Sequence, residues 1–124
     1  MPQEPSFPDP AAALAYFQQK LAFTMGPVEL RRRITESTDL HVIDVRAAED
    51  YQQGHIPGAV NLPQDRWTTN AGLAKGKANV FYCYSATCPL AAQAAAYFAK
   101  RHFPVMELLG GFDEWGRRGF EIEK

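Results

Sequence analysis

Short apolar runs alternate with longer segments rich in helix formers along most of this chain. Brief runs rich in valine, isoleucine or leucine are typical of buried strands, whereas apolar positions that recur every three or four residues indicate helices. The pattern predicts strands at 22–25, 41–45, 59–62, 80–83 and 105–109, helices at 11–21, 28–36, 47–53, 90–100 and 112–118, and irregular structure at 64–79. Strands that alternate with helices favour an α/β fold, in which helices cover both faces of a parallel sheet.

The first ten residues differ from the rest because four of them are proline. Proline interrupts regular structure, so residues 1–10 are predicted to form a flexible tail. The remainder, residues 11–124, has the length of a single domain and can bury a core without metal or disulfide support. We therefore expect one domain with an extra helix at its N-terminus, over about 11–21.

That N-terminal helix has a clear start signal. Asp9 offers an N-cap side chain, and Pro10 suits the first helical position. Leu14, Phe17 and Leu21 follow at helical spacing and are predicted to face the core.

Composition narrows the choice of partners and location. The 13 basic and 14 acidic residues give a net charge of −1, which offers no reason to expect nucleic-acid binding. No apolar run approaches the ~18 residues of a membrane span, and the N-terminus lacks the pattern of a secretory signal. Two cysteines cannot supply a disulfide framework or a four-cysteine zinc site, so no metal is expected. A cytoplasmic location is therefore expected, with a periplasmic protein supplied without its signal as the alternative. The oligomeric state stays open.

Cys83 is the strongest candidate for chemistry. It ends a predicted strand and precedes a tight loop and a helix that starts at Pro89. Inward-facing backbone N–H groups of such a loop form an anion site, and the helix N-terminus adds positive charge. Both stabilise a thiolate, which is the nucleophilic form, and both would stabilise a persulfide. The loop residues predicted to form this site are Tyr84, Ser85, Ala86, Thr87 and Cys88. The alternative is a buried, inert cysteine.

Three motifs together resemble the rhodanese-like domain family. The first contains DVR at 44–46, EDY at 49–51 and GHIPGAVNLP at 54–63. The second is the loop from Cys83 to Cys88 followed by PLAA. The third is GGFDEW at 110–115.

This resemblance implies a central parallel five-stranded sheet and a sulfur-carrying cysteine at Cys83. It also implies sulfurtransferase activity. The Cys83 thiolate would take a sulfane sulfur from a small-molecule or protein donor as a persulfide and pass it to an acceptor. No metal or organic cofactor is needed for that chemistry.

The other motif residues are interpreted as structural. Asp44 and Arg46 are predicted to join the strand end to the next helix through ionic hydrogen bonds, with Glu49 as a further partner. His55 is predicted to be a hydrogen-bonded structural residue. Arg66 and Trp67 have two open interpretations, as a pocket rim near Cys83 or as ordinary surface. The turn and core positions are Gly58, Gly110, Gly111, Phe112 and Trp115.

The loop departs from the usual pattern in two ways. Ala86 and Cys88 stand where many members have glycine and a basic residue, and no lysine or arginine lies between Cys83 and Lys100. A phosphatase is therefore disfavoured, and a bulky or protein persulfide donor gains support over thiosulfate. Cys88 itself has two interpretations: it resolves the Cys83 persulfide, or it merely packs or caps the next helix. A dithiol redox protein and a non-catalytic binding module remain as alternative functions.

Overall fold

The computed structural model describes residues 7–36 and 39–124. The elements are α1 (Pro10–Phe23), β1 (Thr24–Met25), α2 (Pro27–Glu36), β2 (Leu40–Asp44), α3 (Ala48–Gln53), β3 (Val60–Asn61), the 3₁₀ helix η1 (Gln64–Thr69), β4 (Ala78–Tyr82), α4 (Leu90–Lys100), β5 (Val105–Leu108) and α5 (Gly111–Arg117). Every predicted helix and strand is present in the predicted order. The prediction for residues 64–79 was wrong in part, because that segment contains η1 and the start of β4.

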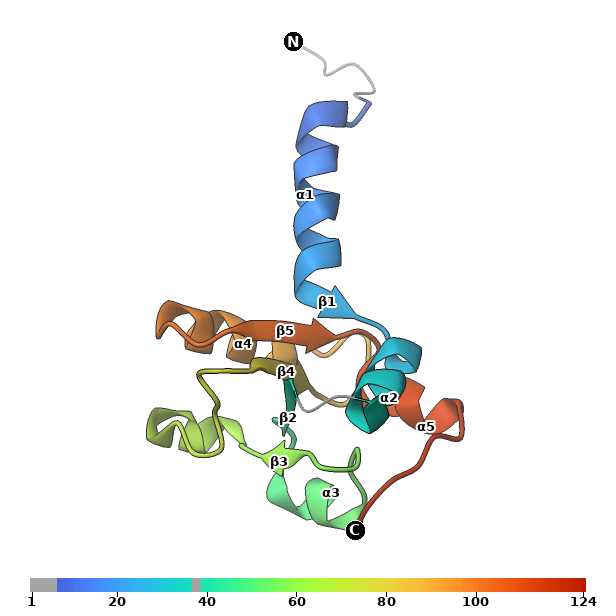
Figure 1. The fold of residues 1–124 in the computed structure, drawn as a ribbon, viewed down its shortest axis with the longest axis vertical. Coiled ribbons are helices and arrows are strands. Elements are labelled where there is room, and N and C mark those ends of the chain that lie inside the picture. The colour runs from blue at the N-terminus through green and yellow to red at the C-terminus, as the bar shows by residue number, and fades with distance from the viewer. Residues whose placement is uncertain (1–6, 37–38) are drawn as a thin grey trace.

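The five strands form one parallel sheet with the order β1-β5-β4-β2-β3, as Figure 1 shows. The central strand β4 pairs with β2 through Ile43 opposite Phe81, and with β5 through Phe81 opposite Glu107. In a parallel sheet all carboxyl ends lie at the same edge. The chain that leaves β4 at Cys83 therefore meets the chain that leaves β2 at Val45.

Side chains that alternate along β4 divide the core between the two faces of the sheet. Phe81 and Cys83 lie on the face covered by α4 and η1, whereas Val80 and Tyr82 lie on the face covered by α2 and α5. Buried contacts on the first face come from Trp67, Ala91, Ala94 and Phe98, and those on the second face come from Leu30, Ile56 and Trp115. The predicted α/β arrangement with helices on both faces is confirmed, as is the core position of Trp115.

Helix α1 begins as predicted but lies elsewhere. The Ala12 N–H donates to the Asp9 carboxylate at 3.2 Å, and Pro10 occupies the first turn. Residues 1–6 of the predicted tail lie outside the described residues, and the tenth is already helical. Among the described residues, no helix is long and apolar enough to cross a membrane.

The predicted packing of α1 on the core was wrong. Leu14, Phe17 and Leu21 have exposed fractions of 59%, 53% and 79%, and no residue of the helix is buried. Figure 1 shows the reason: α1 runs away from the sheet beyond the edge strand β1, and among the described residues it meets the sheet at β1 and β5 alone of the elements with more than marginal contact. Helical spacing defines an apolar stripe, but it does not say whether the tertiary structure covers that stripe.

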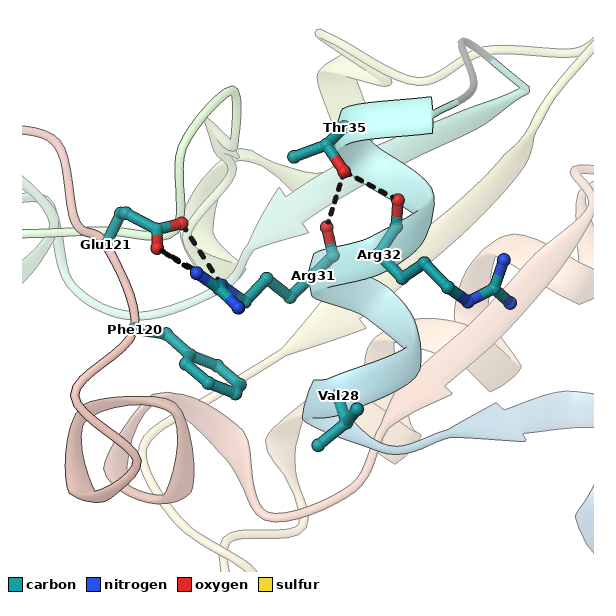
Figure 2. Close-up of a pocket in the computed structure, with 6 residues that line it drawn as sticks. All are labelled: Val28, Arg31, Arg32, Thr35, Phe120 and Glu121. Atoms are coloured by element: carbon teal, nitrogen blue, oxygen red, sulfur yellow. Dashed lines mark hydrogen bonds and ion pairs between the residues drawn. The ribbon is translucent and has the colours of Figure 1, made fainter.

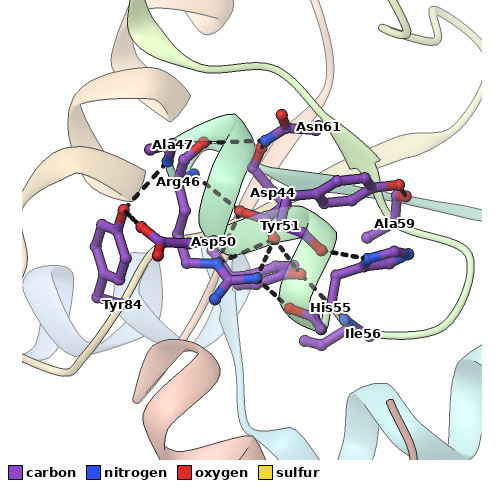
Figure 3. A network of polar contacts seen from close by, with 12 residues as sticks. Asp44, Arg46, Ala47, Asp50, Tyr51, His55, Ile56, Ala59, Asn61 and Tyr84 are labelled. Carbon is purple, nitrogen blue, oxygen red and sulfur yellow. Dashed lines mark hydrogen bonds and ion pairs between the residues drawn. The ribbon is translucent and has the colours of Figure 1, made fainter. Parts of the chain in front are cut away.

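A buried ionic network lies where β2 and β4 end (Figure 3). The Asp44 carboxylate is fully buried and accepts hydrogen bonds from the Arg46 guanidinium at 2.8 Å and from the Tyr82 hydroxyl at 2.6 Å. The same guanidinium donates to the Gly54 carbonyl at 2.6 Å. The predicted Asp44–Arg46 pair is confirmed, and its further partner is Tyr82 where the sequence suggested Glu49.

The turn after α3 is held by the C-terminal segment. His55 donates through Nδ1 to the Tyr51 carbonyl at 2.8 Å and stacks on that tyrosine ring. The Gly58 N–H, in a residue with φ of 81°, donates to the Glu123 carboxylate at 2.9 Å. His55 and Gly58 therefore have structural contacts of the predicted kind.

Replacing Asp44 with alanine is expected to destabilise the protein strongly. The substitution leaves a buried guanidinium and a buried hydroxyl without their acceptor, at a cost of about 3–5 kcal/mol. The measurement is the free energy of unfolding by urea titration. Arg32→Ala is the control, because its pair with Glu36 is exposed and contributes less than ~1 kcal/mol. Equal losses in the two variants would contradict the role of the network.

Candidate active site

The loop from Cys83 to Pro89 connects β4 to α4 at the carboxyl edge of the sheet. It curls back on itself, since the Cys88 N–H donates to the Ser85 carbonyl at 3.2 Å. This turn brings the two cysteines together, and their side chains hydrogen-bond to each other. Both are free thiols; Cys83 has an exposed fraction of only 1%, whereas Cys88 is half-buried.

The two thiols differ in acidity, and the difference is opposite to the expectation for Cys83. Burial and, after it, the hydrogen bond with Cys88 raise the pKa of Cys83 to about 12, although the Tyr84 N–H acts in the opposite direction. The predicted lowering of the Cys83 pKa was therefore wrong. The cost of burying a charge outweighs the stabilisation from the loop amide.

Cys88 is the more acidic partner. Burial opposes its ionisation, but hydrogen bonds from the Cys83 thiol and from the backbone N–H groups of Leu90 and Tyr84 lower its pKa below the ordinary value. The two thiols therefore titrate as a coupled pair, in which Cys88 loses its proton more readily than Cys83.

The predicted anion site, made of inward-facing N–H groups of the loop, forms only in part. The Tyr84 N–H contacts both sulfurs, and the Leu90 N–H, which the sequence analysis did not include, contacts Cys88. The Cys88 N–H is occupied by the Ser85 carbonyl. The Ser85 and Thr87 hydroxyl oxygens lie 3.3 Å apart, and Ala86 is exposed.

The N-terminus of α5 orients the first two peptides of the loop. The Phe112 N–H donates to the Cys83 carbonyl at 2.9 Å, and the Asp113 N–H donates to the Tyr84 carbonyl at 2.8 Å. In a trans peptide the carbonyl and the following N–H point in opposite directions. Contact with α5 therefore turns the Tyr84 N–H toward the two sulfurs, and the Ser85 N–H into the loop.

Gly111 permits this close approach. A Cβ atom there would lie 2.8 Å from the Cys83 carbonyl oxygen and from the Ser85 nitrogen, and its φ is 64°. The sequence predicted a glycine turn at this position. It did not predict that the turn packs directly on the cysteine loop, because that contact joins segments far apart in the chain.

The Tyr84 side chain anchors the loop to α3, as Figure 3 shows. Its hydroxyl donates to the Asp50 carboxylate at 2.5 Å and accepts from the Ala47 N–H at 3.1 Å. The Arg46 guanidinium lies 5.8 Å from the centre of the tyrosine ring. Sequence analysis considered only the Tyr84 amide, so this positioning role of the side chain was missed.

Two cavities lie away from the Cys83 side chain. One, of about 290 Å³, is on the α5 face of the sheet and is lined by Arg46, Asp50, Gln53, Gly54, Tyr84, Phe112 and Ile122. The other, of about 350 Å³, is drawn in Figure 2 and is lined by Val28, Arg31, Arg32, Thr35, Phe120 and Glu121. At the second cavity the Arg31 guanidinium forms an ion pair with the Glu121 carboxylate, at 2.6 Å, and lies 4.7 Å from the centre of the Phe120 ring.

The interpretation of Trp67 as a pocket rim was wrong. Trp67 is buried in the same hydrophobic cluster as Cys83, and its indole N–H donates to the Leu62 carbonyl at 3.0 Å. Arg66 is exposed on η1. A tryptophan directly after a strand exit is compatible with either surface or core, and the packing of η1 under α4 decides for the core.

These features define a class: an α/β protein in which the central strand of a parallel sheet ends at a cysteine beneath a loop that leads into a helix. The sequence model of the rhodanese-like domain family matches residues 26–118. The chain belongs to this family, and the resemblance of the three motifs is confirmed.

Several relatives agree with this assignment. The chain is 35% identical over 96 residues to the HTH-type transcriptional regulator Rv0324 of Mycobacterium tuberculosis. This match covers 77% of this chain but only 42% of that regulator. It is 30% identical over 95 residues to a sulfurtransferase of Allochromatium vinosum, covering 75% of this chain and 87% of that protein.

Solved structures support the same fold. The BH2092 protein from Bacillus halodurans has a TM-score of 0.84 and 34% identity, with 93% of this chain and 86% of that chain covered. A rhodanese-like domain protein from Staphylococcus aureus has a TM-score of 0.70 and 25% identity, with 82% and 99% covered.

Replacing Gly111 with alanine is expected to displace the cysteine loop. The added methyl group overlaps the loop backbone at a left-handed φ, which costs about 1–3 kcal/mol of the free energy of unfolding. Gly116→Ala in the same helix is the control, because no atom lies within 4 Å of its Cβ position, and the change is expected to be neutral or stabilising by up to ~1 kcal/mol. Urea titration of both variants gives the comparison. A Gly111→Ala protein as stable as Gly116→Ala would show that the close approach is unimportant.

The hydrogen bond between the two thiols predicts that their pKa values respond in opposite directions when the partner is removed. Cys83→Ala removes the thiol donor, so the pKa of Cys88 is expected to rise toward its ordinary value. Cys88→Ala removes one cause of the raised Cys83 pKa, which is expected to fall but to stay high because burial remains. Thiolate absorbance measured against pH reports both values. Identical titration of the two single-cysteine variants would rule out the unequal pair.

Proposed function

We propose that this protein is a sulfurtransferase that carries a sulfane sulfur as a persulfide on Cys83. The observation that carries the proposal is the hydrogen-bonded pair of Cys83 and Cys88 beneath the loop, with the Tyr84 N–H on both sulfurs. Membership of the rhodanese-like family and the similarity to proteins named sulfurtransferases support it.

The thiol pair supplies a route to the nucleophile. Cys88, as the resting thiolate, accepts the Cys83 proton through their hydrogen bond, and this leaves a thiolate on Cys83. A thiolate of high pKa is intrinsically the stronger nucleophile, although less of it is present. The Cys83 thiolate attacks the outer sulfur of the donor, forms a new S–S bond, and the donor remnant leaves with the electron pair of the broken bond.

The second half of the reaction transfers the sulfur to an acceptor and regenerates the Cys83 thiol. A nucleophilic acceptor attacks the outer sulfur of the Cys83 persulfide, and the Cys83 thiolate leaves and regains the proton from Cys88. The inward-facing N–H groups of Tyr84 and Ser85 are suited to stabilise the persulfide anion between the two steps.

The charge of the loop bears on the choice of donor. Residues 84–99 contain no lysine or arginine, so a doubly charged donor such as thiosulfate meets backbone amides without a side-chain cation. The reacting sulfur group of a persulfide carries at most one negative charge, so it needs less compensation at the loop than thiosulfate, which carries both of its charges on the reacting anion. We therefore infer that persulfides are better donors than thiosulfate for this chain.

The same thiol contact favours a second candidate, a dithiol redox protein. Such a protein would cycle between the two thiols and a Cys83–Cys88 disulfide without binding sulfane sulfur. The two functions differ in the mass that the protein gains or loses.

Loading of sulfur on Cys83 is tested by intact-protein mass after reduced protein is mixed with glutathione persulfide or with thiosulfate. Cys88→Ser protein is expected to gain one sulfur atom, and more completely with the persulfide. Cys83→Ser protein is the matched control and is expected to gain none, although it keeps a thiol in the same loop. If Cys88→Ser protein gains no sulfur from either donor, while wild type only loses two hydrogens, the redox function is supported instead.

A further inference from the structure

The outer sulfur of a persulfide on Cys83 must leave from a nearly closed site. Cys83 has an exposed fraction of 1%, whereas Cys88, on the same loop, is half-buried. The side chain of Cys88 contacts Cys83 directly. Cys88 is thus a nucleophile that already contacts the buried Cys83 sulfur, which an acceptor from solution reaches with difficulty.

We propose that Cys88 is the resolving residue: its thiolate attacks the Cys83 Sγ of the persulfide, forms a Cys83–Cys88 disulfide and expels the sulfane sulfur as hydrosulfide. This inference rests on the proposed function, because it needs sulfur on Cys83. It adds a second residue that touches the reacting atoms, and it defines the product as hydrosulfide.

The ionisation of the pair favours this role for Cys88. Burial opposes the ionisation of Cys88, but the Cys83 thiol and the Leu90 and Tyr84 N–H groups lower its pKa below the ordinary value. Once Cys83 carries sulfur it no longer donates a thiol proton, and the Leu90 and Tyr84 N–H groups are the donors that remain for the Cys88 thiolate. Cys88 forms this thiolate by giving the proton that it accepted during loading to the anionic persulfide. Packing or capping alone would not require an ionised sulfur.

The leaving group decides which sulfur is attacked. Attack on the outer sulfur would expel the Cys83 thiolate, whose pKa is raised by burial. Attack on Cys83 Sγ expels hydrosulfide, which is the base of a stronger acid and therefore the better leaving group. The direct side-chain contact also places Cys88 beside Cys83 Sγ rather than beside the outer atom.

Atoms and electrons balance without an oxidant. The Cys88 thiolate and the protonated Cys83 persulfide give one disulfide and one hydrosulfide ion, and the departing sulfur keeps the proton that it received from Cys88. The outer sulfur takes the electron pair of the broken S–S bond and is reduced, the Cys88 sulfur is oxidised as it enters the new bond, and Cys83 exchanges one S–S bond for another. A low-molecular-weight thiol or a protein dithiol then reduces the disulfide and restores the resting pair.

The backbone turn allows the two sulfurs to approach. The Cys88 N–H binds the Ser85 carbonyl at 3.2 Å, which folds the five-residue spacing between the cysteines into a compact loop. The carbonyls of Cys83 and Tyr84 are held by α5, so the start of the loop stays in place while Cys88 moves. A disulfide needs Cα atoms within ~7 Å, and the side-chain contact between Cys83 and Cys88 favours an approach of this kind.

The test is a single turnover with persulfide-loaded protein and no added thiol. Wild type, Cys88→Ser and Cys88→Ala are loaded with glutathione persulfide in the cold, freed of excess donor, and warmed. Hydrosulfide is measured by monobromobimane trapping, and protein mass and peptide mapping report the sulfur state. Two substitutions at one position guard against a folding artefact in either one.

Wild type is expected to release about one hydrosulfide per loaded protein and to form the Cys83–Cys88 disulfide, at a rate independent of protein concentration. Both Cys88 variants are expected to keep the added sulfur at least tenfold longer. Equal release from wild type and the Cys88 variants, or a loaded wild type that keeps its persulfide, would overturn the resolving role and leave the proposed function intact. If wild-type protein neither gains sulfur nor releases hydrosulfide, the proposed function fails and this inference fails with it. Slower loading of the Cys88 variants reflects the lost proton acceptor, so the release rate is measured on the fraction of each variant that carries sulfur.

Discussion

The Asp44 carboxylate accepts hydrogen bonds from Arg46 and Tyr82 inside the carboxyl edge of the sheet, and the site depends on this buried contact. Tyr82 is the last residue of β4 and directly precedes Cys83. The Arg46 guanidinium reaches the Gly54 carbonyl after α3 and lies 4.1 Å from the Phe112 ring centre at the start of α5. One charge pair thus joins two strands and two helices around the cysteine loop. A buried pair of this kind fixes relative positions even where its net contribution to stability is small.

From this base the loop is oriented by contacts on two sides. The first turn of α5 binds the carbonyls of Cys83 and Tyr84, and Gly111 allows the helix to come that close. On the other side, the Tyr84 hydroxyl joins Asp50 and the Ala47 N–H at the start of α3. The Tyr84 N–H, which contacts both sulfurs, belongs to the same peptide as the Cys83 carbonyl that α5 binds. Its direction therefore follows from the packing of a helix that is distant in the sequence.

The two thiols differ in acidity and in burial, so they are suited to different steps of the reaction. Burial raises the pKa of Cys83, whereas hydrogen bonds from the Cys83 thiol and from two backbone N–H groups lower the pKa of Cys88 against the effect of burial. Cys83 is the stronger but rarer nucleophile, suited to take sulfur from a donor. Cys88 is the more acidic and more accessible thiol, suited to act on the sulfur that Cys83 carries. Both assignments follow from the same hydrogen bond and from the difference in burial at its two ends.

The sequence by itself determined the class of fold, the order of the helices and strands, the Asp44–Arg46 pair and the place of Cys83 at the end of the central strand. These follow from local periodicity, from caps such as Asp9, and from motifs whose residues lie close together in the chain. Only the tertiary structure decided that Cys83 is less acidic than Cys88, that α5 turns the loop amides, that Trp67 is core, and that the stripe on α1 is exposed. Each of these depends on burial or on contacts between distant segments. Burial sets the cost of a charge, and a pattern along the chain does not contain it.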